Sequence, residues 1–184
     1  YGFVFDRPGA VFRPLRTSLS LLGREREIFE TDLDKFFAVF RHTQLAHDAF
    51  SLAEDARIDA CVWDEYRGIR ENYADVQRLT VARRPAADLL PLREHMVEQL
   101  IRHCLAPDLP LRAPRMFAHR LQRAIGLLHL LRTAGEGAPT PSVEDAAEAA
   151  IRLYILLRAV PNLPVDVIHA ADWVEVDPAT CSYD

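Results

Sequence analysis

The sequence predicts an all-α protein: a single domain of five or six helices with a long central helix, an irregular N-terminal segment and an extended C-terminal tail. Three observations predict this class. Apolar residues recur every three to four positions over five long stretches. Capping residues, glycine or proline bound these stretches. The 184 residues, 49% hydrophobic and 27% charged, are enough to bury one core.

The central helix is predicted over residues 32–67. Thr31 is a typical N-cap, with acidic residues in the turn that follows, and Gly68 is a typical helix end. From Leu33 to Cys61 the apolar residues keep the spacing of one helical face. We therefore expect one helix here, continuous or kinked once.

Four further helices follow the central one. They are predicted at 70–83, 92–105, 115–133 and 142–157. In the first of them, Tyr73, Val76 and Leu79 are expected to face inward. Prolines between residues 107 and 114 indicate a stiff connector, and Arg83 and Arg84 are expected to form a solvated helix end.

Residues 1–164 are interpreted as the helical domain, with residues 1–30 as an irregular segment that packs on it. Residues 165–184 are interpreted as an extended tail or a linker to a further, missing domain. Trp173 to Val176 alternates with acidic residues, which indicates an edge strand or a docking arm. Because the chain begins at Tyr1 without an initiator methionine, we expect it to be a fragment of a longer protein.

Charge and composition set the expected environment. The net charge is −5 and the basic residues are scattered, so we expect no nucleic-acid partner. The longest apolar runs, such as 125–131, are too short for membrane insertion. Three widely spaced cysteines without a C-x-x-C pair fit a reducing cytoplasm.

The segment 50–60 concentrates the candidate site residues. Glu54 and Arg57 lie one helical turn apart and are expected to form a structural ion-pair lock. Asp55 and Asp59, on another side of the helix, are the acids expected to be free for interaction with a partner. Arg70 is a further candidate interaction residue.

Enzymatic function is the alternative interpretation. His47 and Glu54 share a helical stripe two turns apart, which makes them candidate metal ligands of a metallohydrolase-like domain. We assign no catalytic residue and no metal site from this pattern, and His95 and His103 are expected at the surface or rim. No phosphate-binding loop is present and Lys35 is the single lysine, so we expect no nucleotide hydrolysis by this chain.

Phe50 to Asp59 resembles the Leu-Phe-x-x-x-Glu-Asp-x-Arg-Ile-Asp stretch of the NorD/CbbO family. The segment from Tyr66 to Arg70 is similar to the family's Tyr-Pro-Gly-Ile/Leu-Arg, with Arg67 in place of the proline. The segment from Tyr1 to Phe5 is similar to its Gly-Thr-Phe-x-Phe, with Phe3 in place of the threonine. Residues 147–154 and Pro161 resemble the helix and proline before the family's linker.

The resemblance implies the helical middle region of an activator protein. Members of this family are large von Willebrand A-domain proteins that work with hexameric MoxR-type AAA+ ATPases. Their target enzymes are nitric oxide reductase in one branch and Rubisco in the other. The resemblance implies no cofactor in this chain, since the Asp-x-Ser-x-Ser motif that holds Mg²⁺ in an A domain does not occur here. It also implies that histidines upstream of Tyr1 could join Glu54 in a metal site.

Overall fold

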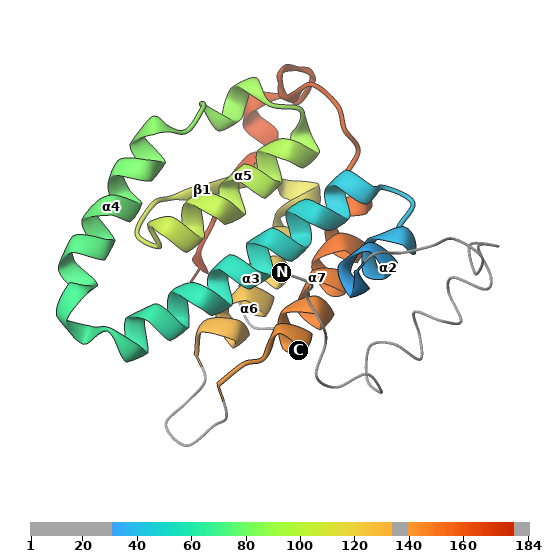
Figure 1. The fold of residues 1–184 in the computed structure, drawn as a ribbon. Helices are drawn as coiled ribbons and strands as arrows, with labels where there is room; N and C mark the ends of the chain where they lie inside the picture. Colours follow the sequence, from blue (N-terminus) through green and yellow to red (C-terminus); the bar gives the residue numbers. More distant parts are fainter. Residues whose placement is uncertain (1–30, 134–139, 179–184) are drawn as a thin grey trace.

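The computed structural model describes residues 31–133 and 140–178, so the predicted N-terminal segment 1–30 lies outside the described residues. Within the described ranges the protein is all-α apart from one small sheet, which confirms the predicted fold class (Figure 1). The helices are α2 (Asp32–Ala38), α3 (Thr43–Glu65), α4 (Arg70–Arg83), α5 (Leu92–Leu105), α6 (Arg115–Arg132) and α7 (Val143–Arg158). None of the described helices is long and apolar enough to cross a membrane.

The predicted central helix is divided into α2 and α3, which corrects the expectation of one helix over residues 32–67. The division brings aromatic rings together. Phe37 stacks on His47 at 3.6 Å and meets Phe50 edge-on at 5.7 Å between ring centroids. In an unbroken helix the Cα atoms of Phe37 and Phe50 would lie about 20 Å apart. Helix α7 contacts the break at residues 39–42, because the Tyr154 hydroxyl accepts a hydrogen bond from the His42 backbone N–H at 3.2 Å.

The core lies where α3 packs against α6 and α7 (Figure 1). Along one face of α3 the buried positions are alanines at helical spacing: Ala46, Ala49, Ala53 and Ala56. Ala146, Ala147 and Ala150 are buried likewise on α7. Helix α7 begins as predicted, since Ser142 and Asp145 form a reciprocal capping box.

The C-terminal tail returns to the domain and forms a strand. β2 (Trp173–Val176) pairs antiparallel with β1 (Leu111–Pro114), with Leu111 opposite Val176 and Pro114 opposite Trp173. Strand β1 lies in the stretch expected to be a proline-rich connector. The burial of Leu111, Ala113 and Val176 in the main core holds this sheet against α6. Residues 179–184 of the predicted tail lie outside the described residues.

Helix α4 lies at the edge of the bundle (Figure 1). Its buried residues are Gln77 and Val81, whereas Val76 and Leu79 are exposed. The expectation that Val76 and Leu79 face inward is therefore wrong. The physical reason is polar: the side of α4 that carries Gln77 turns toward α3, where a buried carboxylate accepts its hydrogen bond.

A buried carboxylate also joins α4 to α5. The side chain of Glu98 is 4% exposed and accepts hydrogen bonds from Arg84 Nη2 at 2.7 Å and from Arg102 Nε at 2.9 Å. Arg84 is thus held by an ion pair, which corrects its expected place at a solvated helix end. Hydrogen bonding to Glu98 raises the pKa of the Arg84 guanidinium. This cluster fixes the segment that links α4 to α5.

Replacing Glu98 by glutamine should lower the free energy of unfolding by about 1–3 kcal/mol, because charge-assisted hydrogen bonds to two arginines are lost. Urea unfolding of the purified protein measures this change. Glu71→Gln is the matched control, since Glu71 is exposed on α4 and should alter stability by less than about 0.5 kcal/mol. Equal effects of the two substitutions would show that the Glu98 cluster contributes nothing specific.

Candidate functional site

The Glu54–Arg57 pair predicted from the sequence is present in α3. Arg57 Nη2 donates to Glu54 Oε1 at 2.6 Å and Arg57 Nε donates to Oε2 at 2.9 Å, a bidentate contact. The Glu54 side chain keeps 18% of its surface exposed and the Arg57 side chain keeps 20%, so the pair lies at the edge of the core. Arg57 Nη1 also donates to the Pro141 carbonyl at 3.4 Å. The pair therefore connects α3 to the segment that starts α7.

Asp59 is 9% exposed, so the expectation that it is free for a partner is wrong. Its Oδ1 accepts a hydrogen bond from the Tyr73 hydroxyl, and its Oδ2 accepts one from Gln77 Nε2 at 2.9 Å. Tyr73 and Gln77 lie one turn apart on α4, and both side chains reach the carboxylate on α3. Burial, and then the hydrogen bond to Asp59, raise the pKa of Tyr73 to about 12.

Asp55 and Arg70 differ in their surroundings. Asp55 is exposed, and its pKa is raised, first by partial loss of hydration and then by the negative charges of Asp59 and Glu54. Arg70 Nε donates to the Trp63 carbonyl at 2.7 Å, and its guanidinium lies 5.8 Å from the centre of the Trp63 ring. Arg70 thus binds the last turn of α3. Of the predicted interaction residues, Asp55 is the one that faces solvent.

The candidate metal ligands are engaged separately. The imidazole of His47 stacks on Phe37, and both carboxylate oxygens of Glu54 are held by Arg57. Across residues 31–133 and 140–178, no group of three His, Cys, Asp or Glu side chains is placed to hold a metal ion.

Two histidines of α5 are buried, which corrects their expected place at the surface. His95 is fully buried, its Nδ1 lies 3.0 Å from the Ala87 carbonyl, and its Nε2 lies 3.1 Å from Gln99 Nε2. Its Nε2 also lies 3.5 Å from the Arg112 carbonyl, so both ring nitrogens have polar partners. His103 is also buried, and burial, together with the charge of Arg132, lowers its pKa to about 4. Both positions continue the apolar stripe of α5, and that spacing was the signal in the sequence.

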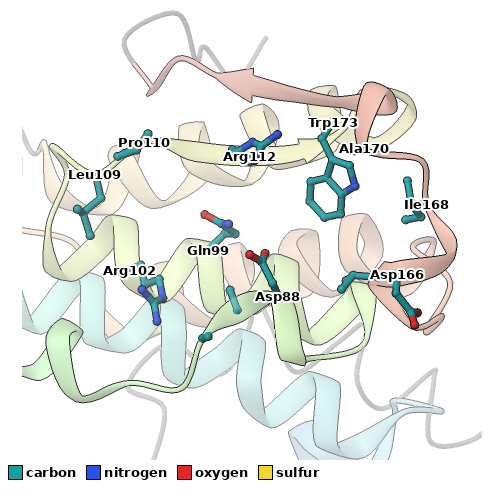
Figure 2. Close-up of a pocket in the computed structure, with 13 residues that line it drawn as sticks. Asp88, Gln99, Arg102, Leu109, Pro110, Arg112, Asp166, Ile168, Ala170 and Trp173 are labelled. Carbon is teal, nitrogen blue, oxygen red and sulfur yellow. The ribbon is translucent and has the colours of Figure 1, made fainter.

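An open cleft of about 680 Å³ lies beside α5, and it could not be located from the sequence (Figure 2). It is enclosed by β1, by η2 (Ala87–Leu89), and by the tail elements η3 (Val165–Val167) and η4 (Ala170–Asp172). Its polar side chains are Asp88, Gln99, Arg102, Arg112 and Asp166, and its largest apolar wall is Trp173. The cleft exists because the tail returns to pair with β1, a contact between segments about sixty residues apart.

His95 forms a rigid support next to this cleft. The Trp173 ring meets its imidazole edge-on at 5.0 Å between centroids, and Asp88 Oδ1 lies 3.6 Å from its Nδ1. A second cleft of about 520 Å³ adjoins the first, and both are lined by Ala86, Arg102 and Leu109. The polar walls of the first cleft suit it to binding a ligand or a segment of a partner.

No protein-family model, no curated protein and no solved structure matches this chain. The interpretation of the site therefore depends on its geometry and on the residues between Phe50 and Arg70.

Asp59→Ala should lower the free energy of unfolding by about 1–3 kcal/mol, because the donors on Tyr73 and Gln77 lose their acceptor. Asp55→Ala is the matched control: it lies one turn earlier on the same helix, is exposed, and should change stability by less than about 0.5 kcal/mol. Chemical denaturation of both variants measures the difference. If Asp55→Ala proved as damaging as Asp59→Ala, the anchoring role of Asp59 would be refuted.

Stability should fall as the pH falls from about 6.5 to about 4, partly through His103. In this range the unfolded chain binds a proton at His103 that the folded chain does not. The contribution of His103 to the free energy of unfolding is therefore complete above pH 6.5 and is lost toward pH 4. One such proton gives a slope of at most about 1.4 kcal/mol per pH unit. His103→Leu should flatten the curve of unfolding free energy against pH. Parallel curves for the wild type and the variant would contradict this assignment.

Proposed function

We propose that this chain is the helical scaffold of an activator protein that couples a hexameric MoxR-type AAA+ ATPase to a target enzyme such as nitric oxide reductase or Rubisco. The partner classes come from the resemblance to the NorD/CbbO family. The observation that supports a scaffold role is the arrangement of the Glu54–Asp59 segment, which carries that resemblance. From this segment, Arg57 reaches the start of α7 and Asp59 holds α4.

In this proposal α3 transmits movement between two surfaces. Hydrogen-bonded contacts on two sides make α3, α4 and the start of α7 one stiff unit, so a displacement at one end reaches the other. The ATPase ring supplies the displacement when it hydrolyses ATP. The single lysine of the chain, Lys35, forms a local pair with Asp32 at 2.9 Å. We propose that the partner ATPase carries out the nucleotide hydrolysis. We also propose that the protein lies in the cytoplasm, together with that ATPase.

Asp55 is the residue of the proposed recognition surface that can be tested directly. It is exposed on α3 between the two internal contacts, where a partner would sense the position of the helix. A complementary positive group on the partner would contribute to specificity and to the rate of association.

The full-length protein should co-purify with a MoxR-type ATPase and change its rate of ATP hydrolysis.

Asp55→Lys should reduce activation of the target enzyme about tenfold, the effect of ~1.4 kcal/mol of lost complementarity. Asp64→Lys is the matched control, because Asp64 is an exposed acid near the end of the same helix. Absence of both co-purification and a change in ATPase rate would refute the proposed partner. Normal activation by Asp55→Lys would remove Asp55 from the interface.

A further inference from the structure

We infer that the cleft between Asp88 and Trp173 binds an organic cation, a primary ammonium or guanidinium group. The inference is carried by the walls of the cleft and does not depend on the proposed ATPase partner. At about 680 Å³ the cleft has the size of sites that take small molecules or one to three side chains.

The aromatic wall is held in place before any ligand arrives. Trp173 begins β2, pairs with Pro114, and rests edge-on against the imidazole of His95. That imidazole is itself fixed by the Ala87 carbonyl and by Gln99. The Trp173 ring projects into the cleft on the side opposite Asp88 (Figure 2). A tryptophan face attracts cations more strongly than any other aromatic side chain.

The carboxylate that faces this wall lies near a histidine. The side chain of Asp88 is 88% exposed, and its Oδ1 lies 3.6 Å from His95 Nδ1, which also lies 3.0 Å from the Ala87 carbonyl. Within the described part of the chain, no lysine or arginine forms an ion pair with Asp88 or Asp166. Asp88 and Trp173 both touch His95, so one small cation can contact the carboxylate and the ring together.

One of the two arginines that line the cleft is engaged with oxygens. Arg102 donates from Nε to Glu98 at 2.9 Å and from Nη2 to the Pro85 carbonyl at 2.7 Å. Arg112 is exposed and lies opposite Glu175 in the sheet, where cross-strand neighbours share a face and opposite charges attract. Asp88 is the charged side chain that faces the Trp173 ring, so a cation is favoured at this end of the cleft.

Two sources can supply such a group: a free small cation, or an arginine or lysine side chain in an extended segment of a partner. Leu109, Pro110 and Ile168 also line the cleft and would contact residues next to that side chain. The probes are agmatine for the first source and the capped peptide acetyl-Ala-Ala-Arg-Ala-Ala-amide for the second. A peptide with citrulline in place of arginine is the neutral control.

The chain contains two tryptophans, Trp63 and Trp173, so its NMR spectrum contains two indole N–H signals. Trp173→Phe assigns them, and Trp63→Phe gives the same assignment should the first variant fail to fold. At constant ionic strength, either cationic probe should shift the Trp173 signal saturably and leave the Trp63 signal in place. The citrulline peptide should leave both signals unchanged. Tighter binding of the peptide identifies a partner segment, and tighter binding of agmatine identifies a free cation.

Asp88→Asn should weaken the binding about two- to fivefold, the effect of losing one solvent-exposed ion pair. Asp64→Asn is the matched control, because the side chain of Asp64 is 86% exposed and lies on α3, outside the cleft. The inference is overturned if neither probe moves the Trp173 signal at about 10 mM, since this is ten times the Kd of a millimolar ligand. It is also overturned if the citrulline peptide binds equally well, or if Asp64→Asn weakens binding as much as Asp88→Asn.

Discussion

The close approach of α3 and α7 is the constraint on which the rest of the structure depends. Their contact is the most extensive between any two described elements, and both helices bury alanines along it. Small side chains let two helix axes come near each other, but they leave no room there for a charged group. The charges of the Glu54–Asp59 segment therefore lie at the borders of this interface. Glu54 and Arg57 lie at the border near Pro141, and Asp59 lies at the border covered by α4.

Three carboxylates join elements of the fold. Arg57, held by Glu54, reaches the start of α7, and Asp59 binds α4. Glu98 of α5 binds Arg84 at the end of α4 and Arg102 on its own helix. Burying a charge costs free energy that its partners roughly offset, so such contacts contribute more to a unique arrangement than to total stability. This explains how α4 keeps its position although it buries only Gln77 and Val81.

The parts of the fold that could be predicted are those with local causes. Ser142 and Asp145 cap α7 within one turn, and the helices at 70–83 and 92–105 match their predicted bounds. The break before α3 was missed because the Tyr154 hydroxyl, which accepts the hydrogen bond from the His42 backbone N–H, belongs to a helix more than one hundred residues away. The burial of Asp59 was missed for the same reason, since its two donors belong to another helix. The Glu54–Arg57 pair was predictable because both residues lie in one turn, whereas the cleft requires the pairing of β1 with β2.

Helix α5 connects these separate features. Positions 95, 98, 99 and 102 lie close together on its surface, because they are three or four residues apart. His95 supports Trp173 and Gln99 lines the cleft, while Glu98 holds Arg84 at the end of α4. Arg102 belongs to both sets, since it lines the two adjoining clefts and donates to Glu98. One guanidinium group therefore contacts the anchor of α4 on one side and lines the wall of the cleft on the other, which places the two features next to each other on α5.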